Sequence, residues 1–292
     1  MSFSFKTSLH TSLRSSLIIL KLVIPIYILA DILFFYNLLS HVSFLFEPIT
    51  SLLNLPPEAA LSIVSGMLLN LYAAIAFAAP LGLSPQEWTI LGVYLGICHA
   101  LLVETAVMKK LGISKLYSVL LRVSAGLIVG FITTLLPSSL FNALHVEKNF
   151  EKETYSDIYA LLLNSMQEAF ILSIEIIALI SILIFILDFI KSLKFIQEYS
   201  NKVSSAFSIT IGVILGITYG AGILISEYEK NTISKKETFY IGTFLMICHA
   251  IIEDTLLFVI FGANIWVIVT LRVLFAFIFA LALLKIYEKK FA

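Results

Sequence analysis

The sequence predicts an all-α integral membrane protein made of two repeats with inverted topology. Composition and an internal duplication carry this prediction. Of the 292 residues, 60% are hydrophobic and 13% are charged, and the mean hydropathy is +1.01. A water-soluble domain of this length does not need so much apolar surface. The chain therefore indicates a set of apolar helices that cross a bilayer.

A stretch of eight residues occurs twice, at an offset of 150 residues. Residues 98–105 read Cys-His-Ala-Leu-Leu-Val-Glu-Thr, and residues 248–255 read Cys-His-Ala-Ile-Ile-Glu-Asp-Thr. A register held over many positions indicates an internal duplication, so we divide the chain into repeats at 1–145 and 146–292. The same offset relates Gly66 to Gly216, Ser84 to Ser234, Glu87 to Glu237, Gly92 to Gly242, and Arg122 to Arg272.

Each repeat contains a long apolar segment, a segment rich in small residues, and two further apolar segments. In the first repeat we expect a short interfacial helix over 3–15, full spans over 17–39, 87–108 and 115–136, and the small-residue segment at 59–80. In the second repeat the corresponding segments are 156–190, 205–225, 238–261 and 265–285. The pairs Ser84/Glu87 and Ser234/Glu237 are typical of a capping box that opens each motif helix.

Lys and Arg residues indicate how many segments cross the membrane. If 59–80 and 205–225 are re-entrant or broken helices, each repeat has three full spans, and Lys148 and Lys152 alone lie opposite the N-terminal side. If every segment crosses, the positive charges are divided more evenly. The positive-inside rule therefore favours a multi-pass inner-membrane protein with both termini cytoplasmic. An odd number of spans per repeat inverts the second repeat relative to the first, as in many secondary transporters.

Five ionisable residues of the duplicated motif define a candidate binding site. They lie within apolar segments, where such groups are costly and normally face the protein interior or a water-filled cavity. An isolated charge there needs a partner, so the neighbouring spans should supply countercharges. The five residues are His99, Glu104, His249, Glu253 and Asp254.

Each repeat offers an arginine as that countercharge. Glu104 and Arg122 each lie about nine residues from the bend at Gly112, so antiparallel helices bring them to similar depth. The same argument pairs Asp254 with Arg272. Such a pair either holds two helices together or contacts a substrate, and the sequence leaves both roles open.

The second repeat carries an extra carboxylate. Glu253 has no predicted arginine, and Val103 occupies its place in the first repeat. A continuous helix would place His249 and Glu253 on one face, which indicates a site specialised for a substrate or a coupling proton. A metal ion bound by His99, His249 and Glu253 is an alternative. A buried structural role is favoured for Cys98 and Cys248, and no cofactor is expected.

Further residues extend the candidate site. Backbone groups of a Gly-rich stretch can face a ligand closely, and hydroxyl and amide groups can bind a polar solute. These secondary residues are Thr105, Thr255, Asn70, Gly216 and Gly220.

The order of these segments resembles the nucleoside-recognition (Gate) domain, once per repeat. The features that carry the resemblance are a long first helix with a proline, the segment Leu61–Ala79 with Ser65-Gly66 and Asn70, and two following spans. Concentrative nucleoside transporters, ferrous iron transport protein B and spore maturation membrane proteins share that domain. The motif Cys-His-Ala-x-x-x-(Glu/Asp)-Thr is similar to that of a bacterial and archaeal branch. Because the sequence has no Gln-Thr-Glu signature and no P-loop, the resemblance implies architecture rather than substrate.

Together these features predict a secondary-transporter-like protein that moves a small polar or anionic solute, coupled to protons, through a midplane site. A lipid-phosphate translocase and a divalent-metal transporter are alternatives. A membrane-embedded enzyme using His249 and Glu253 is disfavoured, because no nucleophile or His-Glu-x-x-His motif accompanies them. Expected partners are the substrate and membrane lipid, and a homodimer stays open. Zero net charge and the lack of a basic arm argue against nucleic acid.

Overall fold

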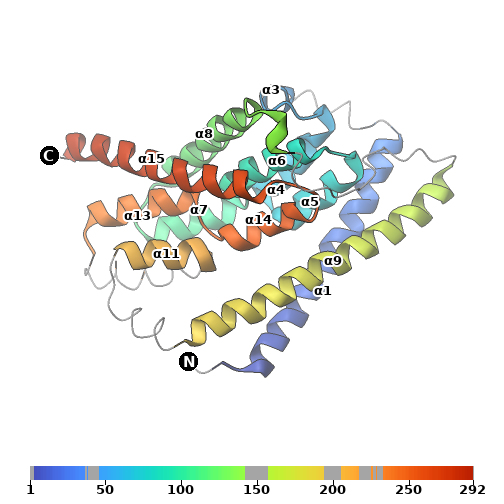
Figure 1. Ribbon diagram of the computed structural model, residues 1–292, viewed down its shortest axis with the longest axis horizontal. Helices are drawn as coiled ribbons and strands as arrows, with labels where there is room; N and C mark the ends of the chain where they lie inside the picture. The colour runs from blue at the N-terminus through green and yellow to red at the C-terminus, as the bar shows by residue number, and fades with distance from the viewer. Residues whose placement is uncertain are drawn as a thin grey trace.

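The computed structural model describes residues 3–36, 38, 46–141, 157–193, 205–216, 225, 228 and 233–291. Within these ranges, six helices are long and apolar enough to cross a membrane, three from each repeat, as the sequence predicts (Figure 1). Two shorter apolar helices accompany them. The six are Phe5–Phe35, Pro85–Lys110, Lys115–Thr134, Ile158–Ser192, Lys235–Val259 and Ile265–Lys289, and the shorter two are Pro57–Leu68 and Leu71–Leu81.

In each half, a long helix is followed by one or more shorter helices, a motif helix in two parts and a final span. In the first half they are α1 (Phe5–Phe35), α3 (Glu47–Leu52), η1 (Pro57–Ala59), α4 (Ala60–Leu68), α5 (Leu71–Ala78), η2 (Ala79–Leu81), α6 (Pro85–Cys98), α7 (Leu101–Lys110), α8 (Lys115–Thr134) and η3 (Ser138–Leu140). In the second half they are α9 (Ile158–Ser192), α11 (Ser205–Leu215), α13 (Lys235–Ile247), α14 (Ile251–Val259) and α15 (Ile265–Phe291).

The long helices α1 and α9 lie side by side along one flank of the molecule (Figure 1). Ser8 Oγ donates to Asp188 Oδ2 at 2.8 Å, and Ser12 and Ser181 share a hydrogen bond of 2.7 Å, so the two helices run antiparallel. The separate interfacial helix expected over 3–15 is wrong, because α1 continues unbroken from Phe5. Ser8 and Ser12 of this stretch face α9 instead.

The small-residue segment of the first repeat is a broken helix, as predicted. It divides into α4 and α5 at Asn70, whose side-chain Oδ1 accepts from the Ala73 N–H at 3.0 Å and caps α5. Ser62 Oγ donates to Ala74 O at 2.8 Å and joins the two halves. In the second repeat α11 ends before Gly216, which has a φ of +88°.

The motif helices are also broken, which the sequence analysis did not predict. Continuous helices were expected over 87–108 and 238–261, but α6 and α13 end just before Ala100 and Ala250, and α7 and α14 begin just after them. Both alanines adopt the left-handed conformation, with φ of 44°. The predicted capping boxes are present at the starts of α6 and α13.

The two repeats pack against each other reciprocally. A Cβ on Gly92 would lie 3.0 Å from the Phe258 side chain, and a Cβ on Gly242 would lie 3.8 Å from Met108 Sδ. These four residues form two pairs related by the same offset of 150. Trp88 adds a stack on Phe261, with ring centroids 4.2 Å apart.

The contacts correct one detail of the repeat alignment. A Cβ on Gly66 would lie 2.8 Å from the Leu95 side chain, and a Cβ on Gly212 would lie 2.5 Å from the Leu245 side chain. Because Leu95 and Leu245 are equivalent, Gly66 corresponds to Gly212 rather than to Gly216. The shift of four residues, one helical turn, is difficult to detect in a segment made of similar small and aliphatic residues.

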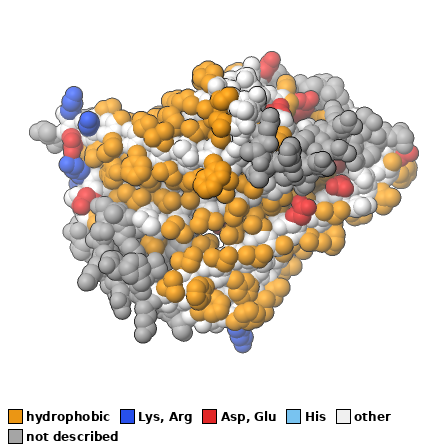
Figure 2. Space-filling model, in the orientation of Figure 1, with side chains coloured by type: hydrophobic (Ala, Val, Ile, Leu, Met, Phe, Trp, Pro, Cys, Tyr) orange, Lys and Arg blue, Asp and Glu red, His pale blue; other side chains and the backbone are white. Residues whose placement is uncertain are grey.

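The outer surface fits a lipid environment. Hydrophobic side chains cover most of the face shown in Figure 2, and the Lys and Arg side chains gather at its edges. Exposed leucine, isoleucine and phenylalanine residues recur along α1 and α9. Such a continuous apolar surface is expected where helices contact lipid.

Candidate functional site

Two arginines complete the broken ends of the motif helices. A helix that stops leaves carbonyl groups without N–H partners. Arg122 donates from Nε to Ile97 O at 2.7 Å and from Nη2 to His99 O at 2.8 Å. Arg272 does the same in the second repeat, with distances of 3.4 Å to Ile247 O and 2.7 Å to His249 O. Both guanidinium groups are fully buried.

The breaks also join the motif helices to the small-residue helices. The Ala100 N–H donates to Gly66 O at 2.9 Å, and the Ala250 N–H donates to Gly212 O at 3.3 Å. The extended backbone of His99, with ψ of 165°, turns the Ala100 N–H away from α6. Gly66 and Gly212 therefore join each motif break to the neighbouring helix. A side chain at either glycine would collide with Leu95 or Leu245.

Replacing Ala100 with glycine is expected to raise the free energy of unfolding by about 1 kcal/mol, because glycine adopts the left-handed conformation without steric strain. Chemical unfolding in mixed detergent micelles measures the change. Ala106, exposed on α7, is the matched control, since glycine there should lower stability by about 1 kcal/mol. A loss of stability in both variants would contradict the proposed strain at Ala100.

Both predicted carboxylate–arginine pairs are present. Arg122 Nη1 lies 2.7 Å from Glu104 Oε2, and Arg272 Nη2 lies 3.1 Å from Asp254 Oδ2. The guanidinium groups therefore neutralise two buried carboxylates while binding the helix ends. This double engagement indicates a structural role for both arginines.

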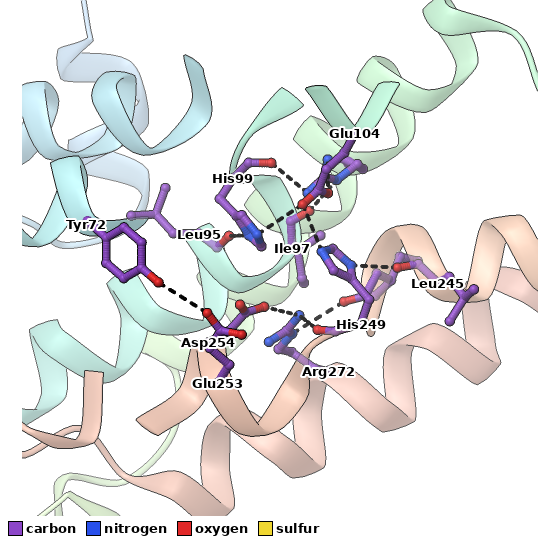
Figure 3. Close-up of polar contacts among 12 residues, drawn as sticks. Tyr72, Leu95, Ile97, His99, Glu104, Leu245, His249, Glu253, Asp254 and Arg272 are labelled. Carbon is purple, nitrogen blue, oxygen red and sulfur yellow. Dashed lines mark hydrogen bonds and ion pairs between the residues drawn. The ribbon is translucent and has the colours of Figure 1, made fainter. Parts of the chain in front are cut away.

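One carboxylate also meets both motif histidines. Nε2 of His99 and Nε2 of His249 each lie 3.1 Å from Glu104 Oε1 (Figure 3). The two imidazole rings are tilted by 35°, with centroids 5.2 Å apart. We call His99, Glu104 and His249 the histidine–glutamate triad. It brings together both repeats at the level of the motif breaks.

The histidine tautomers follow from the backbone contacts. Nδ1 of His99 lies 2.8 Å from Leu95 O, and Nδ1 of His249 lies 2.7 Å from Leu245 O. A carbonyl oxygen can only accept, so each Nδ1 carries a proton. In neutral rings both Nε2 atoms then present lone pairs toward the carboxylate. The triad therefore requires a proton or a metal cation between its three facing atoms.

The two repeats differ at this point by one methylene group. Glu104 reaches its arginine and both histidines, whereas the equivalent Asp254 forms an ion pair with Arg272. The two repeats therefore differ in the contacts of Glu104 and Asp254, and the specialised role expected of Glu253 stays a prediction. The pairing of His249 with Glu253 on one helix face is wrong, because the helix break separates them.

Glu253 forms its hydrogen bond outside the triad. Its Oε1 accepts a hydrogen bond from Tyr72 Oη at 3.2 Å, which links α14 to α5 (Figure 3). The metal-ligand set of His99, His249 and Glu253 is accordingly corrected: within the described residues, Glu104 takes the place of Glu253. Tyr72 was missed in the sequence, where a lone tyrosine in an apolar segment carries no signal.

The remaining predicted residues have separate roles. Thr105 Oγ1 lies 3.4 Å from Ser118 Oγ, whereas the buried Thr255 Oγ1 has no hydrogen-bond partner among the described residues. Asn70 caps α5, and Gly216 follows α11. Gly220 lies outside the described residues. Cys98 and Cys248 are free and buried, as predicted.

Comparison with known proteins supports the assignment of the chain as a membrane protein. The chain is 27% identical over 281 residues to "Uncharacterized membrane protein YvoD" of Bacillus subtilis (strain 168), covering 92% of this chain and 90% of that protein. The chain is a multi-pass helical membrane protein. No protein-family model matches it, and no solved structure matches it. The likeness to the Gate domain therefore stays a resemblance.

Proposed function

We propose that this protein is a secondary-transporter-like membrane protein that moves a small polar or charged solute past the motif breaks. The observation that carries the proposal is the meeting of broken helices from both repeats at one buried polar centre. Interrupted helices that expose backbone groups near a repeat interface are the usual build of secondary transporters. The triad is the natural position for a bound cation.

Two observations support inverted repeats. The equivalent helices α1 and α9 run antiparallel, as their serine contacts require. The equivalent glycines Gly92 and Gly242 contact equivalent partners in the opposite repeat, the reciprocity expected of a twofold axis. With three spans per repeat, both termini then lie on the same, cytoplasmic side.

Unmet polar groups favour a small solute at this centre. Arg272 Nη1 and Thr255 Oγ1 are buried without hydrogen-bond partners in the described part of the chain. A buried donor without a partner costs free energy, which a bound polar solute or water removes. The lipid-phosphate alternative is less favoured, because the other donors of Arg272 and the guanidinium of Arg122 already bind carboxylates and helix carbonyls, which leaves little for a whole phosphate group.

A ligand panel on the detergent-purified full chain tests this proposal. Inorganic and organic anions, nucleosides, lipid phosphates and divalent cations are compared by thermal shift, and positive ligands are then followed into proteoliposomes. We expect at least one ligand to shift the wild-type transition and to accumulate in the vesicles. Glu253→Gln should weaken the response, because it alters the carboxyl group that Tyr72 Oη contacts, whereas Glu47→Gln at an exposed carboxylate should not. A panel without any shift or uptake would reject the transporter.

A further inference from the structure

We propose that the histidine–glutamate triad binds one divalent transition-metal ion of the zinc class, through Nε2 of His99, Oε1 of Glu104 and Nε2 of His249. The three atoms lie within 4.8 Å of one another, and Oε1 lies 3.1 Å from each nitrogen. Ligands of a tetrahedral ion at about 2.0–2.1 Å are separated by about 3.3 Å. The two oxygen-to-nitrogen distances match this separation to within about 0.2 Å, whereas the two nitrogens, at most 4.8 Å apart, approach each other when the ion binds.

The supporting contacts of both histidines fit metal ligation. A metal-binding histidine normally donates its second ring N–H to a carbonyl or carboxylate, which fixes the ring and the tautomer. His99 and His249 donate from Nδ1 to the carbonyls of Leu95 and Leu245, at 2.8 and 2.7 Å. Both Nε2 lone pairs are thereby aimed at one point, and this arrangement comes from two different repeats.

The ligand types define the chemical class of the ion. Two imidazoles and one carboxylate suit zinc, ferrous iron, cobalt or nickel, whereas magnesium and calcium prefer oxygen ligands. Arg122 occupies Oε2 of Glu104, which leaves one carboxylate oxygen for the ion. The nearby guanidinium charge also weakens binding, as a site from which an ion must leave requires.

The triad leaves one coordination position of the ion open, so the ion can enter and leave. Three protein ligands leave the fourth position of a tetrahedral ion open, unlike the closed sites that serve structure alone. The relative solvent exposure is 8% for His99 and 7% for Glu104, but 1% for His249. The side of His99 and Glu104 is therefore the more accessible one. Its role as cargo rests on the proposed transport function, whereas its binding does not.

Equilibrium binding to the full-length protein in detergent tests the site. We expect Zn²⁺ to compete with a chelating dye in a one-to-one ratio, and Co²⁺ to give the visible absorption of a tetrahedral site. His249→Gln removes one ligand without uncovering a buried charge, and it should weaken Zn²⁺ binding by about 100-fold or more. His10→Gln, the same change at an exposed histidine, should leave binding unchanged. Equal affinity in both variants would overturn the proposal.

A second variant, which replaces one histidine ligand with cysteine, tests the site by a gained signal rather than by lost binding. His249→Cys keeps a donor at the site, so Co²⁺ should remain bound and gain a sulfur-to-cobalt charge-transfer band in the near ultraviolet. The wild type should lack that band. A band already present in the wild type would show a cysteine ligand and overturn the proposed set, as would an unchanged spectrum in His249→Cys.

Uptake into proteoliposomes separates binding from transport. Zn²⁺ that binds at the triad and accumulates in wild-type vesicles, but not in those with His249→Gln, supports the ion as cargo. Binding without uptake supports the site and rejects the cargo role. No binding to a folded wild type overturns the inference, while transport of another solute in the ligand panel would still support the proposed function.

Discussion

Replacing Arg122 with methionine should lower the free energy of unfolding by about 3–5 kcal/mol, the cost of breaking a buried ion pair from one side. The change leaves the Glu104 carboxylate buried without its countercharge. It also removes the hydrogen bonds to Ile97 O and His99 O, which close the broken end of α6. Chemical unfolding in mixed detergent micelles measures the loss.

Two variants show whether charge or backbone contacts dominate. Adding Glu104→Gln to Arg122→Met removes the uncompensated charge, so stability should recover in part, but the two carbonyls stay unpaired. Arg14→Met replaces an exposed arginine and should change stability little. If Arg122→Met unfolds at the wild-type denaturant concentration, the guanidinium does not hold the break.

Replacing Trp88 with alanine should cost about 3–5 kcal/mol, the range for deleting a large buried aromatic side chain. Trp88 is 2% exposed, stacks on Phe261 at 4.2 Å and lies 6.3 Å from Phe258. It belongs to α6 of the first repeat, whereas both phenylalanines belong to the second. The cavity would therefore open between the repeats, where dispersion contacts are the main attraction in a membrane protein.

Trp266 provides the control, because it is the second of two tryptophans and is 75% exposed. Trp266→Ala should change the free energy of unfolding by less than about 1 kcal/mol. Intrinsic fluorescence in each variant reports the remaining tryptophan. If both variants lose the same stability, the Trp88 contacts do not contribute specifically to the repeat interface.

Much of the fold could be predicted because its signals are periodic and local. The spans are long apolar runs, the capping boxes have fixed spacing, and the duplication is visible at Cys98 and Cys248. The pairing of Glu104 with Arg122 was also predictable, since a bend between two antiparallel helices makes residues equidistant from it neighbours.

The helix breaks could not be predicted, because the residues at them favour continuation. Ala100 and Ala250 are strong helix formers, and their left-handed conformation is stabilised by distant groups, Gly66 O and Gly212 O. On a continuous helix, His249 and Glu253 would share a face. The triad was hidden for the same reason, since His249 meets Glu104 across 145 residues of chain.

The lengths of α1 and α9 have a consequence for the surrounding bilayer. With 31 and 35 residues, they extend about 46 and 52 Å, whereas the hydrocarbon core is about 30 Å thick. To lie within that core α1 would need a tilt of about 50°, beyond the usual range for membrane helices. The pair must therefore lean and also project into the headgroups, and its inclination depends on membrane thickness. α1 packs against α5, which begins at the break at Asn70. A thinner or thicker bilayer that changes the tilt of α1 therefore also acts on this break. Lipid composition then becomes a means of setting the position of α5.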